Sequence, residues 1–186
     1  MNTGHYRRID DRINVLRKII SPFQDQLNEM RKINKEEDFL YWDSVYADDM
    51  EHIVGTVFIV LQNYINSSIH DLYPKLKQIH EKYSIDEKID NSNISRIELI
   101  IAIANFYKHR DSPSELRKNT IKPFDNLNIP TKVIYGLGNE DFFHKTGSDS
   151  PVYQGFNFLS EYWDFNELIN IVTKWRENLW IQEELK

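Results

Sequence analysis

The chain of 186 residues contains no cysteine. A disulfide framework, a thiolate zinc site and a cysteine nucleophile are therefore excluded. The amino-terminal residues lack the apolar segment that a signal peptide needs. The longest uncharged run, residues 53–69, contains Gln, Asn and Ser side chains and would make a poor membrane span. We therefore expect a soluble, cytoplasmic protein that does not contact a membrane.

Motifs of several common enzyme classes are also missing. No G-x-x-x-x-G-K phosphate loop is present, and residues 136–138 lack the third glycine of a dinucleotide fingerprint. The Lys-Thr-Gly triplet at 145–147 has no S-x-x-K partner, so it does not indicate an acyl-transferase of the β-lactamase type.

Asp48, Asp49 and His52 have a spacing that could present metal ligands on one face of a helix. No second pattern of this kind occurs on another predicted helix, so an exposed acidic face is the favoured interpretation. We predict no metal and no cofactor.

The apolar content of 40% and aromatic content of 13% are typical of a folded globular protein. Apolar residues recur with the period of a helix in separate segments. The sequence therefore predicts a single all-α domain over residues 1–186. Its architecture would be an antiparallel helical bundle of about five helices, with one long loop over about 128–160 and a brief strand near 131–135.

The expected helices cover about 6–33, 38–69, 74–83, 95–113 and 164–184, with a short helical or irregular piece after Pro113. Ser21-Pro22 would either kink the first helix or divide it in two. Asp164 and Glu167 have the spacing of a capping box at the start of the last helix. The first helix carries an a/d seam that could pack within the fold or across a dimer, made of Ile9, Ile13, Leu16, Ile20, Phe23, Leu27 and Met30.

Charge is unevenly distributed along the chain. The net charge of -6 argues against broad, charge-driven binding of nucleic acid. Residues 37–51 hold six acids and no Lys or Arg, whereas residues 108–122 hold five bases and two acids, a local charge of +3. The basic stretch thus begins where the apolar helix of residues 95–113 is expected to end.

That apolar helix is the stretch that indicates chemistry. Ser95 and Glu98 have the spacing of a capping box, and the residue before Pro113 is disfavoured in a helix. Nearly every residue between these ends is apolar, so burial on most sides is expected. Its polar residues Asn105, Lys108 and His109 follow Glu98 at spacings that place them near one face.

Two accounts fit the end of this helix. In the structural account, Lys108, His109 and Arg110 complement the negative end of the helix dipole, and Asn105 links helices by hydrogen bonding. In the chemical account, His109 is a general acid or base acting on a ribose hydroxyl, because the pKa of imidazole suits this role near neutrality. Lys108 and Arg110 would then hold a phosphate.

The pattern Asn105-x-x-x-His109 on a helical bundle resembles the HEPN superfamily, many members of which are metal-independent ribonucleases of toxin–antitoxin and phage-defence systems. The resemblance implies an RNA-binding homodimer whose two motifs meet to form one cleavage site. It implies catalytic roles for Asn105 and His109, the two residues that match the motif. Lys108 and Arg110 complete the predicted catalytic set as the cations that would hold the phosphate. The following bases, Arg117, Lys118 and Lys122, would bind the substrate.

The family's usual arginine is absent, because its position falls on Ala104. Either Lys108 and Arg110 supply the missing cation from another direction, or the protein is a non-catalytic member. The alternative function is an acidic binding protein, an antitoxin or immunity-type partner or a scaffold for another protein. Residues 37–51 would then form its interface, with Tyr41, Trp42 and Tyr46 among the acids.

Overall fold

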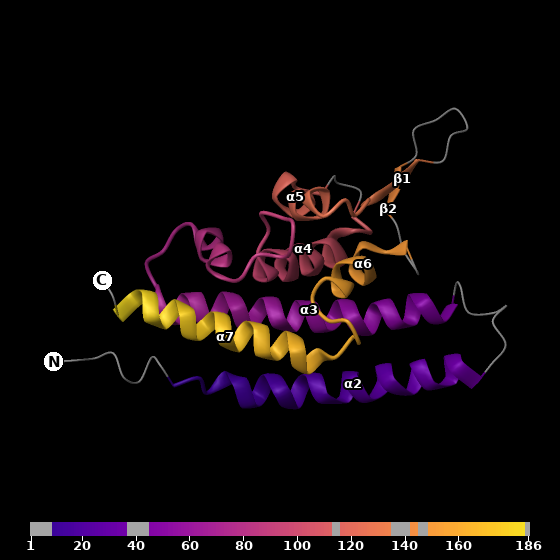
Figure 1. Ribbon diagram of the computed structural model, residues 1–186, viewed down its shortest axis with the longest axis horizontal. Helices are drawn as coiled ribbons and strands as arrows, with labels where there is room; N and C mark the ends of the chain where they lie inside the picture. The colour runs from indigo at the N-terminus through magenta and orange to yellow at the C-terminus, as the bar shows by residue number, and fades with distance from the viewer. Residues whose placement is uncertain (1–8, 37–44, 113–115, 135–141, 145–148, 185–186) are drawn as a thin grey trace.

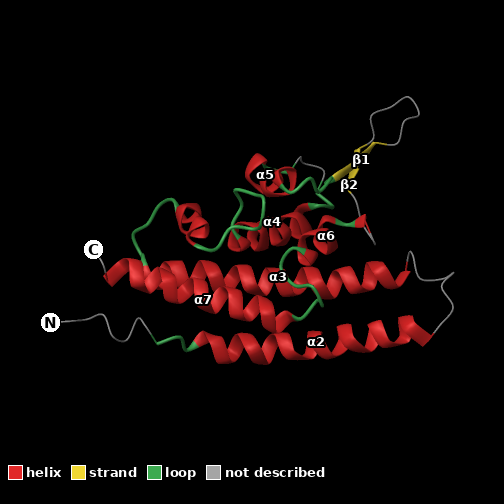
Figure 2. Ribbon diagram, viewed as in Figure 1, coloured by secondary structure: helices red, strands yellow, loops and turns green. Residues whose placement is uncertain are grey.

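The computed structural model describes residues 9–36, 45–112, 116–134, 142–144 and 149–184. Its elements confirm the predicted all-α bundle (Figure 2). The α-helices are α2 (Arg12–Glu36), α3 (Val45–Leu72), α4 (Arg96–His109), α5 (Lys118–Asn126), α6 (Pro151–Asn157) and α7 (Phe165–Glu184). A 3-10 helix, η2 (Ile79–Ile85), precedes α4, and β1 (Lys132–Ile134) pairs antiparallel with β2 (Phe142–His144).

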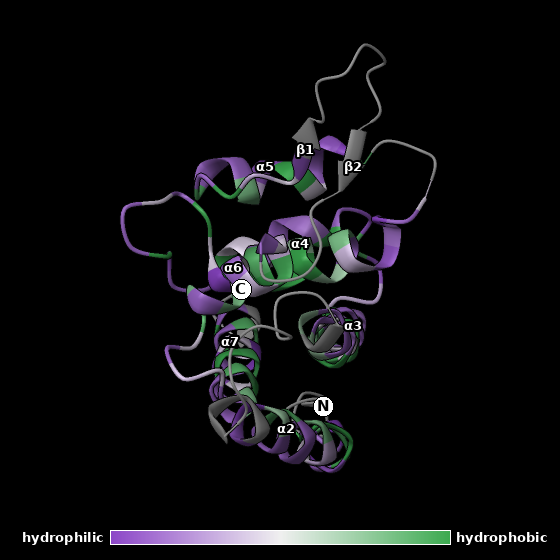
Figure 3. Ribbon diagram, turned by 90° about the vertical axis from the view of Figure 1, so that its right-hand side faces the viewer, coloured by the Kyte–Doolittle hydropathy of each residue, from purple (hydrophilic) through white to green (hydrophobic). Residues whose placement is uncertain are grey.

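The helices stack in tiers (Figures 1 and 3). α2 forms one outer tier, α3 and α7 lie side by side above it, and α4 and α6 lie on α3. α5 covers α4 on the opposite side from α3. α4 is thus enclosed by neighbours, which explains why its sequence is apolar in nearly every position.

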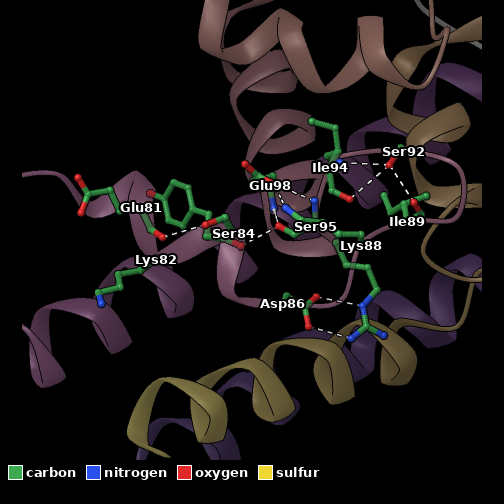
Figure 4. Close-up of polar contacts among 12 residues, drawn as sticks. Glu81, Lys82, Ser84, Asp86, Lys88, Ile89, Ser92, Ile94, Ser95 and Glu98 are labelled. Carbon is green, nitrogen blue, oxygen red and sulfur yellow. Dashed lines mark hydrogen bonds and ion pairs between the residues drawn. The ribbon is translucent and has the colours of Figure 1, made fainter. Parts of the chain in front are cut away.

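The burial predicted for α4 is confirmed. Eight of its fourteen residues are buried, among them Ala102 and Ala104. The predicted capping box is also present: the Ser95 hydroxyl accepts a hydrogen bond from the Glu98 amide at 3.0 Å, and the Glu98 carboxylate accepts one from the Ser95 amide at 2.8 Å (Figure 4). These two bonds satisfy donors that the first turn of a helix otherwise leaves unpaired. They fix the point from which α4 runs to His109.

α2 differs from its prediction at two points. It is one helix with Pro22 inside it, so the division into two helices is wrong, and its first residue is Arg12 rather than residue 6. Pro22 lies on the exposed side, where water can take over the hydrogen bond that a proline cannot donate. Residues 1–8 lie outside the described part of the chain. Leu16, Ile20 and Leu27 are buried in the core of the same chain, so this part of the seam packs within the fold.

Residues 128–160 are not one long loop. β1 confirms the brief strand, and α6 occupies the end of the predicted loop. Pro151 begins α6 with Ser150 as its N-cap, a position where a missing amide hydrogen costs nothing. Gly155 lies inside the helix because it packs on α4, where an added Cβ would meet Ile103 at 2.7 Å.

Two smaller differences concern helix starts. The predicted helix at 74–83 is the 3-10 helix η2, which begins only at Ile79. At the start of α7, the amide of Asp164 donates to the Ser160 hydroxyl at 2.8 Å. The Ser160 hydroxyl is thus the acceptor that the predicted capping box assigned to the Glu167 carboxylate. The predicted end of α7 at Glu184 is confirmed. Residues 38–44 of the second predicted helix lie outside the described residues.

Candidate functional site

The predicted site residues at the carboxyl end of α4 differ in how far they are exposed to solvent. Lys108 and His109 are exposed, and Asn105 is half-buried one turn before them. Arg110 is instead 8% exposed. The structure therefore brings Asn105, Lys108 and His109 together at the surface and turns Arg110 inward.

Asn105 and Lys108 are joined through a residue of α3. The Lys108 ammonium donates to Gln62 Oε1 at 2.5 Å, and Gln62 Nε2 donates to Asn105 Oδ1 at 2.9 Å. Gln62 is only 6% exposed, so this relay runs from the surface into the contact between α3 and α4. Sequence analysis missed Gln62, which lies more than 40 residues from both partners.

Desolvation lowers the pKa of Lys108 below its ordinary value of 10.5, because the ammonium lies against the protein at Gln62. Among the described residues, Gln62 is its one side-chain hydrogen-bond partner. An ammonium carries three donors, so two remain to hold an anion. A partly desolvated cation with unused donors is suited to bind a phosphate, since less water must be removed on binding.

His109 is exposed, and its side chain makes no hydrogen bond within the described residues. It occupies the last position of α4, at the carboxyl end of the helix. Its backbone carbonyl accepts a hydrogen bond from the Ser112 amide at 3.0 Å, which holds the chain as it leaves the helix. The imidazole is thus carried on a rigid element and is accessible to a ligand.

Arg110 forms an ion pair with Glu51 of α3, and both side chains are buried. Ser150 donates to the same carboxylate at 2.5 Å, and the Arg110 guanidinium lies 4.9 Å from the centre of the Tyr107 ring. The Glu51 carboxylate of α3 therefore links Arg110 at the end of α4 with Ser150 at the start of α6. We assign Arg110 to the packing of the fold rather than to the phosphate contact expected from sequence.

The second group of predicted bases lies on the neighbouring helix. Arg117, Lys118 and Lys122 are all exposed, and α5 rests on α4 through an edge-to-face contact of Phe124 with Phe106 whose ring centres are 5.7 Å apart. Lys118 and Lys122 thus lie on α5, and Arg117 is its N-cap, so all three bases belong to the element that packs directly on the helix carrying the candidate site. Exposure and charge make them available for a long polyanion.

Tyr107 occupies a close contact between α3 and α4. Its hydroxyl lies 2.7 Å from His52 Nδ1, and its ring covers Gly55 so closely that an added Cβ would lie 2.3 Å from it. His52 is thus engaged by a tyrosine. Asp48 and Asp49 are exposed, and no group of three or more possible ligands in the described ranges is placed to hold a metal ion.

None of the helices that the structure describes is long and apolar enough to cross a membrane. Comparisons with protein-family models, with curated proteins and with solved structures find no match to this chain.

Proposed function

We propose that the protein is a metal-independent endoribonuclease, with His109 as the proton-transfer group and Lys108 and Asn105 as contacts to the scissile phosphate. The observation that carries the proposal is the grouping of an accessible imidazole, a partly desolvated ammonium and an amide at one end of α4. Each of these groups matches one need of phosphodiester cleavage.

The reaction follows from these groups. Neutral His109 takes the proton of a ribose 2′-hydroxyl, whose oxygen attacks the adjacent phosphorus. The bond from phosphorus to the 5′-oxygen breaks, and that oxygen takes a proton from a protonated imidazole. The products are a 2′,3′-cyclic phosphate and a free 5′-hydroxyl. The Lys108 ammonium and the Asn105 amide stabilise the charge on the non-bridging oxygens, so no metal ion is needed.

The family's arginine position is occupied by Ala104, so another residue must supply the cation of the proposed site. Ala104 is fully buried, so a long charged side chain at this position would have to enter the core. The guanidinium of Arg110, the second cation considered for this role, is already paired with Glu51. The geometry therefore favours Lys108 as the cation of the site.

The alternative, an acidic binding surface at residues 37–51, has less support. Of its acids, Glu51 is buried against Arg110, whereas Asp48 and Asp49 are exposed. Residues 37–44, which include Tyr41 and Trp42, lie outside the described residues, as does the side chain of Tyr46. This surface becomes the preferred explanation if no RNA is cleaved.

We expect the purified protein to cleave a mixed-sequence RNA in the presence of EDTA and to leave 2′,3′-cyclic phosphate ends. The matched 2′-deoxy oligonucleotide should stay intact, because it lacks the attacking hydroxyl. Gel electrophoresis with end-group analysis measures both, on fractions taken across the protein's gel-filtration peak. Cleavage that EDTA abolishes, or RNA that remains intact at all protein concentrations, contradicts the proposal.

The proposed reaction uses two proton transfers, and each chain supplies one His109. We therefore expect a two-fold homodimer in which both copies of His109 reach one shared cleft. Sedimentation equilibrium at tens of micromolar, a concentration on the order of the affinities of weak dimers, should give twice the monomer mass. A monomer at this concentration would contradict a shared site.

A further inference from the structure

Gln62 is a buried polar side chain that links two residues of the candidate site by hydrogen bonds. It lies on α3 with 6% of its surface exposed, and both ends of its amide are engaged. One end accepts from Lys108 and the other donates to Asn105, two residues that lie one turn apart on α4. An apolar residue of similar size would fill the same space.

The direction of the relay follows from hydrogen-bond chemistry. An ammonium can only donate, so the Gln62 amide must turn its oxygen toward Lys108. Its NH₂ group then faces Asn105, which can accept only through Oδ1. The Asn105 NH₂ group must therefore point away from Gln62, and no described residue accepts a hydrogen bond from it.

We infer that Gln62 is a positioning residue that directs the Asn105 NH₂ group and the Lys108 ammonium toward one anion, a phosphodiester of RNA. The inference rests on the proposed function for the identity of the anion. Without Gln62, the Asn105 amide could rotate and present its oxygen, which would repel a phosphate. With Gln62, the outward groups of Asn105 and Lys108 are all donors.

This arrangement should raise the affinity for the anion, because less conformational entropy is lost when the ligand binds. Half-buried Asn105 has its side chain fixed before the ligand arrives, so less rotamer freedom is lost. The same preorganisation keeps donors aimed at the phosphoryl oxygens as charge develops there. Gln62 contributes to both effects without touching the ligand.

The test uses a short RNA with 2′-O-methyl groups on every ribose, which can bind but cannot be cleaved. Binding is followed by NMR through the side-chain amide signals of Asn105 and by fluorescence anisotropy. In the wild-type protein, the Asn105 NH₂ signals should shift on titration. In Gln62→Leu, that shift should disappear and the dissociation constant should rise about 10- to 100-fold, the range that hydrogen bonds to charged groups carry.

Gln62→Glu separates positioning from packing. A glutamate at 62 still accepts from Lys108, but it also accepts from Asn105 and so turns the Asn105 NH₂ group inward. Binding should therefore fall although the Lys108 contact is kept. The matched control for its negative charge is Asn63→Asp, on the exposed neighbour of Gln62 in the same helix. Asn63→Asp and Asn63→Leu should each keep the Asn105 shift and lower the affinity far less.

A double-mutant cycle gives the decisive readout. If Gln62 acts partly through Asn105, Gln62→Leu should cost less affinity in an Asn105→Ala protein than in wild type. Additive losses, an unchanged Asn105 shift in Gln62→Leu, or a wild type that does not bind the 2′-O-methyl RNA would each overturn the inference. Wild type that binds this RNA through Asn105 but leaves ordinary RNA intact would support the role of Gln62 and reject the nuclease.

Discussion

RNA cleavage by a His109→Ala variant is expected to be slower than cleavage by the wild type by about 10²–10⁴-fold, the usual contribution of general acid–base catalysis. His109 is exposed at the end of α4 and has no side-chain partner within the described residues, so its removal should leave the fold intact. Loss of its interaction with the helix dipole costs only ~0.3–1 kcal/mol of stability. Single-turnover rates on gels, together with thermal melting, measure both effects.

The matched control for this variant is His80→Ala, because His80 is an exposed histidine of η2 outside the candidate site. Its cleavage rate should equal that of wild type.

Lys108→Ala should weaken cleavage and lower the salt dependence of binding by about one phosphate contact. A His109→Ala protein that cleaves at the wild-type rate excludes His109 as the proton-transfer group. If wild type itself is inactive, the acidic binding protein becomes the better explanation.

Glu51→Ala is expected to lower the free energy of unfolding by about 3–5 kcal/mol, since it leaves the buried Arg110 guanidinium with only the exposed Asp111 carboxylate, 3.7 Å away, as a counter-charge. Glu51 is fully buried, and it accepts hydrogen bonds from both Arg110 and Ser150. Denaturant titration followed by circular dichroism should show the loss as a lower midpoint. Arg110→Ala should lose a similar amount, in contrast to the small change that its position at a helix end predicts from sequence.

Asp49→Ala is the control for Glu51→Ala. Asp49 is an exposed acid two residues before Glu51 in the same helix, and its removal should change stability by less than about 0.5 kcal/mol. Replacing both Glu51 and Arg110 by methionine should cost less than either single alanine variant, because no charge is then left unpaired. A Glu51→Ala protein as stable as Asp49→Ala would show that the ion pair does not hold the helices together.

Local signals predicted α4 well. Its start depends on Ser95 and Glu98, three residues apart, and its burial follows from an unbroken apolar run. α6 was missed because Pro151 and Gly155 normally interrupt helices. Here Pro151 takes the first position of the helix, and Gly155 is needed for the close approach to Ile103. That approach depends on tertiary packing, which one segment of sequence cannot reveal.

The candidate site was predicted only in part for the same reason. Asn105, Lys108 and His109 follow from spacing within one helix. Arg110 lies one turn after the buried Phe106, a spacing that could have indicated an inward direction. Its partner Glu51 lies 59 residues away, and Gln62 lies 43 residues from Asn105. No local pattern connects residues at such separations.

The contact of Tyr107 with Gly55 has a mechanical consequence for the site. The ring fills a gap that is one residue wide, because the residues one turn before and after Gly55, Glu51 and Ile59, both carry side chains. α4 therefore cannot slide along α3 by a turn without lifting the ring out of its seat. The seated ring thereby fixes the register of α4 against α3, and with it the place along α3 at which α4 presents His109.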